Sequence, residues 1–362
     1  MNPTIAILTG GGDCPGLNAV IRGVVRAAVL QRGWRVIGIE DGFDGLVGTP
    51  RWRELDLAAV RGILPLGGTI LGTSNRGNPF AYPVRKGGET VLRDVSAEVV
   101  ANFRALGATT LIAVGGDGTL KIARRLGELG LDIVAVPKTI DNDLQGTDVT
   151  FGYNSAVGVV SEALDRLHST AESHHRVMIV EVMGRDAGWI ALEAGISGSA
   201  DVILLPEIPF SLDAVCAAIA GRRERGSRFS ILVVAEGAHP AEGGKVVRLS
   251  AGENLGVERL GGIGQALAAE LGARLDMENR LVVLGHVQRG GSPTPFDRIL
   301  GSRFGVKAVQ LVEQGKFGRM VALAGRQVDS VPIAAAVEAL NLVDPAGDLC
   351  RTAEELGICL GR

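Results

Sequence analysis

The sequence has few cysteine and few aromatic residues. Its four cysteines, Cys14, Cys216, Cys350 and Cys359, are scattered, with no Cys-x-x-Cys spacing and no histidine cluster nearby. This pattern indicates neither a zinc site nor a disulfide framework, and it is typical of reduced thiols. Phe, Trp and Tyr together make up 4% of the residues, which leaves little surface on which nucleic-acid bases could stack.

Long apolar runs and an excess of charge are also missing. No run approaches the roughly 18 apolar residues of a membrane-spanning helix, and the start of the chain lacks the basic residues and long apolar centre of a signal peptide. We therefore expect no membrane partner and a cytoplasmic location. The 37 Lys and Arg residues are dispersed and are balanced by 40 Asp and Glu residues, so we expect no nucleic-acid partner.

The region from Leu111 to Asp143 carries the clearest structural pattern. Two β-branched apolar runs, Thr110–Val114 and Ile133–Val136, predict buried parallel strands, and Leu120–Leu129 between them predicts a crossover helix. Ligands of parallel sheets bind beyond the carboxyl ends of the strands. We therefore predict an α/β fold in which one crevice is faced by two corners, Gly115-Gly116-Asp117-Gly118-Thr119 and Lys138-Thr139-Ile140-Asp141-Asn142-Asp143.

The first corner, GGDGT, predicts phosphate binding. Its three glycines let the backbone approach an anion, and the helix predicted from Thr119 presents free amide groups. A carboxylate beside a phosphate needs an intervening cation, so Asp117 is predicted to hold Mg²⁺ on the phosphates. The alternative is a plain turn in which Asp117 only caps the helix.

The second corner contains two carboxylates, Asp141 and Asp143, which are two residues apart. In an extended segment such residues point the same way. One could accept a proton from a substrate hydroxyl while the other steadies metal or ligand, as phosphoryl transfer requires. A solvated Asx turn is the alternative for this segment taken alone, but its position beside GGDGT favours the catalytic interpretation.

A third glycine-marked corner lies near the start of the chain. Thr4–Leu8 predicts a strand and Asn18–Gln31 predicts a helix, with Thr9–Gly16 as the loop between them. This is the general form of a nucleotide-phosphate site, although it is neither a Walker A motif nor GxGxxG. An ordinary tight turn is the alternative.

Taken together, these motifs resemble those of the 6-phosphofructokinase family. GGDGT is followed by PKTIDND, with TGGGDCPGLNAVIRG near the start, MGRDAGWIAL in the middle and LGHVQRGGSPTPFDR late, so the resemblance spans Ile5 to Gly315. It implies two Rossmann-like, three-layer α/β/α lobes with mainly parallel sheets. These would be a nucleotide-binding lobe at residues 1–150, onto which C-terminal elements can pack back, a sugar-phosphate-binding lobe at residues 151–318, and a segment at residues 319–362 that completes the fold.

The resemblance also implies an activity. An ATP-dependent 6-phosphofructokinase would transfer the γ-phosphate of ATP to the 1-hydroxyl of fructose 6-phosphate, with Mg²⁺ as cofactor. A pyrophosphate-dependent phosphotransferase and a non-catalytic sugar-phosphate sensor on the same fold are the alternatives. A kinase of NAD or lipids would share GGDGT, but it would leave TIDND, MGR and HVQRGG unexplained.

The resemblance assigns roles to single residues. Asp141 is expected to act as the general base, with Thr139 and Asp143 in support. The residues expected to bind ATP are Gly11, Gly12, Arg76, Gly116, Asp117, Gly118 and Thr119. Those expected to bind fructose 6-phosphate are Thr139, Ile140, Asp141, Arg176, Met183, Gly184, Arg185, Glu236, Arg280, His286, Val287, Gln288 and Arg289. Among them, Arg280, His286 and Arg289 are expected to form a donor-rich cluster for the sugar phosphate.

Arg176 and Arg185 stand at opposite ends of the predicted strand Val177–Val182. Six extended residues cover about 20 Å, so both arginines cannot serve one pocket of one subunit. The resemblance resolves this by a homo-oligomer, a dimer or tetramer, in which Arg176 reaches a neighbouring subunit's site; a surface ion pair is the alternative. Arg22 and Arg26 lie on one helix face, which is typical of a solvated face. The resemblance implies the alternative, because their positions match arginines that bind a phosphorylated effector between subunits in allosteric bacterial members of the family.

Two residues bear on the phosphate donor. Gly118 leaves space for the α-phosphate of ATP, which a carboxylate there would crowd and repel, and in the family this position separates ATP enzymes from pyrophosphate enzymes. Lys138 points the other way, because pyrophosphate enzymes carry lysine there, although a cation can hold a phosphate without excluding ATP. ATP is therefore the expected donor.

Overall fold

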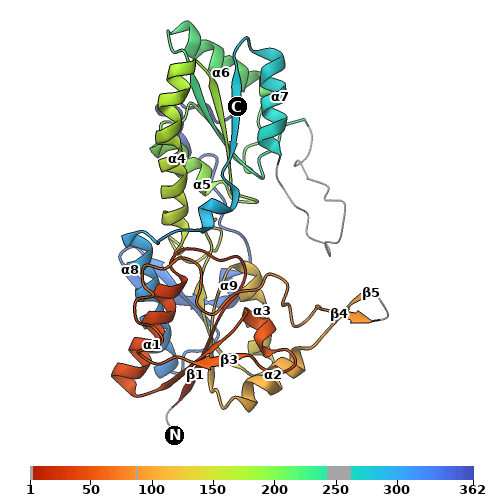
Figure 1. The fold of residues 1–362 in the computed structure, drawn as a ribbon, viewed down its shortest axis with the longest axis vertical. Helices are drawn as coiled ribbons and strands as arrows, with labels where there is room; N and C mark the ends of the chain where they lie inside the picture. The colour runs from red at the N-terminus through yellow and green to blue at the C-terminus, as the bar shows by residue number, and fades with distance from the viewer. Residues whose placement is uncertain (1–2, 87–88, 243–261) are drawn as a thin grey trace. The chain divides into compact units, whose positions relative to one another are not determined.

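The computed structural model describes residues 3–86, 89–242 and 262–362, which form two compact units (Figure 1). Unit 1 consists of Met1–Ile140, Leu144–Ser155 and Arg289–Leu340. Unit 2 consists of Asp141–Asp143, Ala156–Gln288 and Asn341–Arg362. The predicted lobes divide the chain at residues 150 and 318, whereas the chain passes from one unit to the other after Ile140, Asp143, Ser155, Gln288 and Leu340.

Unit 1 is built around a seven-stranded sheet. In spatial order its strands are β13 (Gln327–Pro332), β12 (Arg319–Ala324), β7 (Asp132–Pro137), β6 (Thr110–Gly115), β1 (Thr4–Thr9), β2 (Arg35–Ile39) and β3 (Trp52–Glu54). The strands from β12 to β2 are parallel, and the edge strands β13 and β3 are antiparallel to their neighbours. The structure thus confirms the strands predicted at residues 4–8, 110–114 and 133–136, within one residue at each end.

Helices cover both faces of this sheet (Figure 1). On one face α1 (Leu17–Arg32) packs against α8 (Pro295–Glu313), while α2 (Ser96–Ala105), α3 (Asp117–Glu128), α9 (Ile333–Ala336) and the short helix η1 (Gly42–Leu46) cover the other. Helices α1 and α8 touch through glycine, because a Cβ at Gly305 would lie 2.5 Å from the carbonyl oxygen of Val20. The predicted three layers are therefore present in unit 1.

Unit 2 has a second, fully parallel sheet. Its four strands are, in order, β11 (Asn279–Val283), β8 (Val177–Val182), β10 (Ser230–Ala235) and β9 (Val202–Leu204). One apolar face packs against α6 (Leu212–Glu224) and α7 (Ile263–Arg274). The other packs against α5 (Trp189–Ser197), which in turn contacts α4 (Tyr153–His174) and α10 (Asp348–Glu355).

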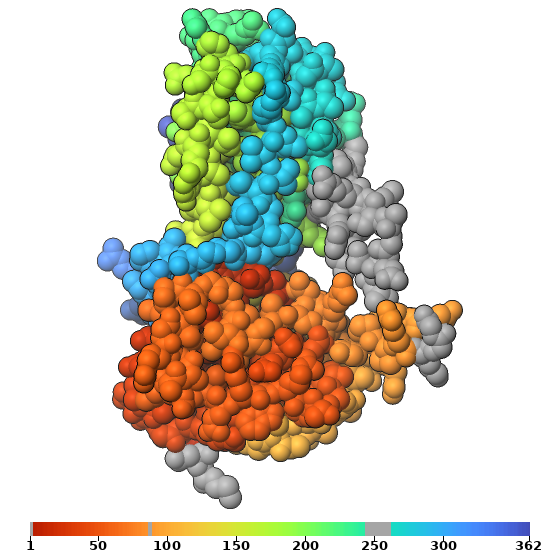
Figure 2. All heavy atoms as spheres, in the orientation of Figure 1, coloured from red at the N-terminus to blue at the C-terminus, as the bar shows by residue number. Residues whose placement is uncertain are grey.

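Some elements have no counterpart in the predicted pattern. The strands β4 (Tyr82–Lys86) and β5 (Glu89–Arg93) form a separate antiparallel pair that stands out from the surface of unit 1 (Figure 2). Residues 319–340 add β12, β13 and α9 to unit 1, and residues 341–362 add α10 to unit 2. The sequence also predicts a helix over Val257–Leu275, of which α7 covers Ile263–Arg274. The start of that prediction lies outside the described residues, which omit 243–261.

None of the helices in the described residues combines the length and the apolar character that crossing a membrane requires.

Candidate active site

Three loops of unit 1 meet at the carboxyl edge of its sheet. Strands β7, β6 and β1 are parallel neighbours. They are followed respectively by Lys138, by Gly116 at the start of α3, and by the loop from Gly10. Because parallel neighbours end at the same edge, the predicted approach of the GGDGT corner to the corner that begins at Lys138 is confirmed.

Thr119 explains two of the glycines at this edge. Its side chain is buried against the ends of β1 and β6. A Cβ at Gly115 would lie 2.3 Å from the Cβ of Thr119, and a Cβ at Gly10 would lie 2.7 Å from its Oγ1. These positions therefore accept only glycine, and the two loops lie close over the first turn of α3.

Asp117 lies in the first turn of α3, because the helix begins at Asp117 and not at Thr119 as predicted. Gly116 is the N-cap residue, and no side chain makes a capping hydrogen bond. The Asp117 carboxylate pairs instead with Nζ of Lys121 at 2.8 Å and keeps 27% of its side-chain surface exposed. The alternative in which Asp117 only caps the helix therefore does not describe this turn.

Gly118 has open space beside it. A Cβ at this position would meet no atom within 4 Å. Among the described residues no group of three or more His, Cys, Asp or Glu side chains could hold a metal ion. A divalent ion at Asp117 would thus depend on ligands from a phosphorylated substrate, which is how proteins usually bind Mg²⁺.

Two positively charged side chains bind the first glycine loop, the loop from Gly10 that follows β1. Nζ of Lys138, a buried residue, donates to the carbonyl oxygen of Gly12. Nη1 of Arg289 donates to the carbonyl oxygen of Asp13 at 3.2 Å, and a Cβ at Gly12 would lie 2.7 Å from that same nitrogen. The loop is therefore held in place by two positively charged side chains through its carbonyl groups.

The loop that carries Arg76 also lies on this glycine loop. Oγ1 of Thr73 donates to the carbonyl oxygen of Gly11 at 2.5 Å, and the amide of Gly11 donates to the carbonyl oxygen of Ser74 at 3.1 Å. Arg76 follows two residues later and is exposed. Asn18, which the sequence did not single out, holds the loop from the other side: its Oδ1 accepts from the amide of Ile70 at 2.9 Å.

Cys14 is a buried residue of the first glycine loop, and it gives a pH-dependent prediction. Burial raises the pKa of its thiol from 9.0 to about 12. Between those values the folded chain keeps a proton that the unfolded chain has lost, so the free energy of unfolding falls as pH rises. From about pH 8 to about pH 10, urea unfolding should show the wild type losing about 1 kcal/mol more than C14A. Equal losses in both proteins would contradict the buried neutral thiol.

The Asp141–Asp143 turn belongs to unit 2, directly after Thr139 and Ile140 of unit 1. Asn142 has φ 51°, in the left-handed region, so the segment is not extended. The extended segment assumed for this turn is therefore wrong, and that both carboxylates face one crevice stays a prediction. In both residues the Oδ1 atom is buried.

Most of the other predicted residues of unit 2 lie at the carboxyl edge of its own sheet. Met183, Gly184 and Arg185 follow β8, Glu236 follows β10, and η2 (Gly285–Arg289), with His286, Val287 and Gln288, follows β11. The amide of Met183 donates to Oε1 of Gln288 at 3.3 Å. A Cβ at Gly237 would lie 1.9 Å from the carbonyl oxygen of Arg185. The structure thus brings these three segments together, with His286 and Val287 exposed.

Arg176 and Arg280 lie at the opposite edge of that sheet. Nε of Arg176 bonds Oε2 of Glu278 at 2.6 Å, and Nη2 of Arg280 bonds Oε1 of the same carboxylate. The hydrogen bond from Arg176 holds the pKa of Glu278 below its usual value. The predicted cluster of Arg280 with His286 and Arg289 is therefore wrong, because Arg280 sits near the start of β11 and Arg289 contacts the glycine loop of unit 1.

Arg22 and Arg26 are one turn apart on α1, where Arg26 is exposed and Arg22 is half-buried.

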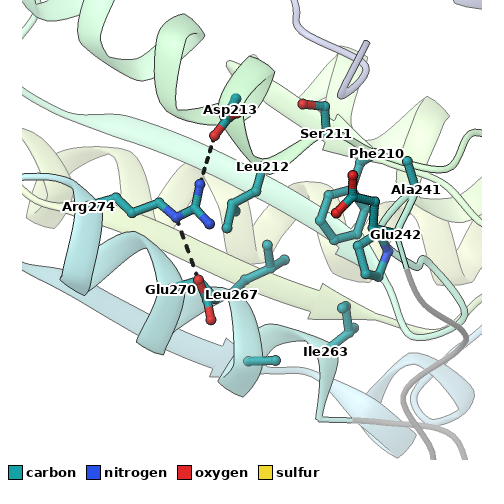
Figure 3. A pocket seen from close by; sticks show the side chains of 12 residues that line it. Phe210, Ser211, Leu212, Asp213, Ala241, Glu242, Ile263, Leu267, Glu270 and Arg274 are labelled. Atoms are coloured by element: carbon teal, nitrogen blue, oxygen red, sulfur yellow. Dashed lines mark hydrogen bonds and ion pairs between the residues drawn. The ribbon is translucent and has the colours of Figure 1, made fainter.

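A separate pocket of about 480 Å³ in unit 2 contains none of the predicted site residues (Figure 3). It lies between the start of α6 and one side of α7, over Phe210, Leu212 and Leu267. Arg274 is held there by two carboxylates, with Nη1 2.7 Å from Oδ1 of Asp213 and Nε 3.5 Å from Oε2 of Glu270 (Figure 3).

Comparison with known proteins agrees with these motifs. The family model described as Phosphofructokinase matches residues 4–312. ATP-dependent 6-phosphofructokinase 2 of Clostridium perfringens is 52% identical over 98% of this chain and 97% of its own length. Pyrophosphate–fructose 6-phosphate 1-phosphotransferase of Streptomyces coelicolor is 50% identical over 99% of both chains. The crystal structure of Pichia pastoris phosphofructokinase in the T-state superposes with a TM-score of 0.80 at 32% identity, over 93% of this chain and 36% of that longer one. The chain belongs to the phosphofructokinase family.

Proposed function

We propose that this protein is an ATP-dependent 6-phosphofructokinase, which transfers the γ-phosphate of ATP to the 1-hydroxyl of fructose 6-phosphate. The observation that carries this proposal is the junction at Ile140 and Asp141. In unit 1 the chain leaves an edge of the sheet where glycine loops are held by Lys138 and Arg289. It continues directly into a turn of unit 2 that carries two carboxylates. Relatives named ATP-dependent 6-phosphofructokinase, about half identical along nearly the whole chain, support the same assignment.

On the nucleotide side, unit 1 supplies donors for phosphate. The free amides at the start of α3, from Gly116 to Thr119, and the loop of Gly11 and Gly12 would bind the phosphates of ATP, with Arg76 as a further cation. Mg²⁺ bound by the phosphates and Asp117 would neutralise the charge that develops during transfer. The partly exposed carboxylate of Asp117, paired with Lys121, suits that role.

In the transfer step, Asp141 takes the proton of the 1-hydroxyl. The oxygen so activated forms a bond with the γ-phosphorus, and the bond from that phosphorus to the β,γ-bridging oxygen breaks, which releases ADP. Thr139 and Asp143 orient the hydroxyl and the base. The products are fructose 1,6-bisphosphate and ADP.

On the sugar side, unit 2 supplies the binding groups. Glu236 would accept hydrogen bonds from sugar hydroxyls, because a carboxylate offers only acceptors. The segment of Met183, Gly184 and Arg185 and that of His286, Val287 and Gln288 would complete the sugar contacts, and Arg289 would add a cation. Arg176 would reach the 6-phosphate bound by a neighbouring subunit of a dimer or tetramer, and Arg280 would accompany it, since both share Glu278.

Two features bear on the donor. The open space beside Gly118 suits the α-phosphate of ATP. Lys138, the residue that favours pyrophosphate, bonds the carbonyl oxygen of Gly12 and so has a role in shaping the loop. The relative from Streptomyces coelicolor that is named for pyrophosphate keeps that donor as the second candidate.

Initial rates with fructose 6-phosphate and Mg²⁺, measured in parallel with ATP and with pyrophosphate, test this assignment. We expect turnover with ATP and none above background with pyrophosphate. Turnover with pyrophosphate and none with ATP would make pyrophosphate the phosphate donor. Activity with neither would favour a sugar-phosphate sensor, and phosphorylation of NAD or diacylglycerol instead would move the protein to another kinase class. Removal of Mg²⁺ by EDTA should abolish the ATP reaction, and addition of Mg²⁺ should restore it.

A further inference from the structure

The carbonyl groups of the Asp141–Asp143 turn are bound by one residue far along the chain, Asn341. Nδ2 of Asn341 donates to the carbonyl oxygen of Asn142 at 2.8 Å. The backbone amide of Asn341 donates to the carbonyl oxygen of Asp143 at 2.9 Å. These two bonds hold consecutive peptide groups of the turn from a single residue.

Asn341 is itself anchored on its other side. Its carbonyl oxygen accepts a hydrogen bond from Nε1 of Trp189, the first residue of α5, at 2.8 Å. Oε1 of Glu207 accepts from the amide of Gly188 at 2.9 Å and from the amide of Val343 at 2.8 Å. The segment at residues 341–343 is therefore tied at two points to the start of a helix, which makes it a rigid support for the turn.

The conformation of the turn explains why such a support is needed. The left-handed φ of 51° at Asn142 is costly for any residue with a side chain, although asparagine tolerates it better than most. Asn142 is only 5% exposed, so water is a poor substitute for a protein donor at its carbonyl oxygen. Without Nδ2 of Asn341 this buried carbonyl would lose a partner, and the turn would gain by relaxing to another conformation.

We infer that Asn341 is a positioning residue for phosphoryl transfer: it holds the turn in the conformation from which Asp141 takes the proton. This rests on the proposed function, and it concerns a residue that has no substrate contact in that scheme. A displacement of about 1 Å at a reacting group can cost about 100-fold in rate. Loss of the Asn341 side chain should therefore lower kcat, and it should leave the binding of ATP by the unit 1 loops unchanged.

N341A tests this with N102A as a matched control. Nδ2 of Asn102 also bonds two backbone carbonyl oxygens, those of Leu46 and Gly48, each at 2.9 Å, within unit 1. With ATP, fructose 6-phosphate and Mg²⁺, we expect N341A to lower kcat by about 10- to 100-fold and to leave the KM for ATP within about twofold. N102A should lower the melting temperature without changing kcat by more than about twofold.

N341D carries the test if N341A does not fold, because it keeps the size of the side chain. Its carboxylate cannot donate to the carbonyl oxygen of Asn142, and its charge should raise the pKa of the neighbouring aspartates. The acid limb of its kcat profile should therefore move to higher pH, which a purely structural defect would not cause. A kcat of N341A close to wild type, an equal loss in N102A, or an unmoved acid limb would overturn the inference. An inactive wild type would instead overturn the proposed function.

Discussion

Replacement of Asp141 by asparagine should lower kcat with ATP and fructose 6-phosphate by about two to four orders of magnitude. The amide has nearly the size and shape of the carboxylate, so the turn keeps its hydrogen bonds to Asn341 through the backbone. It cannot, however, take the proton of the 1-hydroxyl. The KM values for both substrates should stay within about threefold of wild type, because the asparagine side chain can still accept a hydrogen bond from the bound sugar. Initial rates over a grid of both substrate concentrations separate these two quantities.

D132N is the control for this experiment. Asp132 is an exposed carboxylate at the start of β7, at the opposite end of the strand that leads to the turn. Its replacement changes the net charge by the same amount and should leave kcat unchanged. A D141N enzyme that retains a tenth or more of wild-type turnover would remove Asp141 from the role of general base.

G118D should abolish most of the ATP reaction while leaving the fold intact. A Cβ at Gly118 meets nothing within 4 Å, and an acidic residue in the first turn of a helix is favourable, so stability should be kept. The new carboxylate would face the α-phosphate of ATP, and two such charges about 4 Å apart repel by about 4 kcal/mol near a protein surface. We expect kcat/KM with ATP to fall by about 100- to 1,000-fold. Pyrophosphate, which has no α-phosphate at that position, should be affected less.

Two further variants separate the effect of the added charge from the effects of side-chain size and of its position on α3. G118N adds a side chain of nearly equal volume without the charge and should cost far less than G118D. G127D adds the same charge later on α3, at another glycine with nothing within 4 Å, and should leave the ATP reaction unchanged. Equal losses in G118D and G118N would show that crowding, and not repulsion, sets the donor. An unchanged rate in G118D would remove Gly118 from donor selection.

The strands and the loops that follow them could be predicted because buried parallel strands have a simple sequence pattern. Residues 110–114 and 133–136 are short apolar runs rich in β-branched residues, and each is followed by a corner with polar residues, so both the strand and its end are visible in the sequence. The strand of residues 177–182 was predicted at its observed bounds for the same reason.

Backbone conformation inside a turn is less visible in the sequence. The triplet Asp141, Asn142 and Asp143 is compatible with an extended segment or with a left-handed residue at its centre, and the sequence does not distinguish the two. The choice is made by Asn341, about two hundred residues later, in a segment without a recognisable motif. The cluster predicted for Arg280 failed for another reason, because a strand separates its members. Arg280 lies near the start of β11 beside Arg176, whereas His286 follows the end of that strand.

The interleaving of the two units limits how the protein can be taken apart. A fragment that stops at residue 150 would lack α8 and β12, which exposes the apolar side of α1 and leaves β7 as an open edge prone to aggregation. Unit 1 therefore cannot be obtained by shortening the gene from one end. It would have to be made by excision, with residue 155 joined to residue 289 and the chain ended at residue 340. This minimal protein would retain Asp141–Asp143 without the support of Asn341. On the proposed function, it should bind nucleotide and should not transfer phosphate.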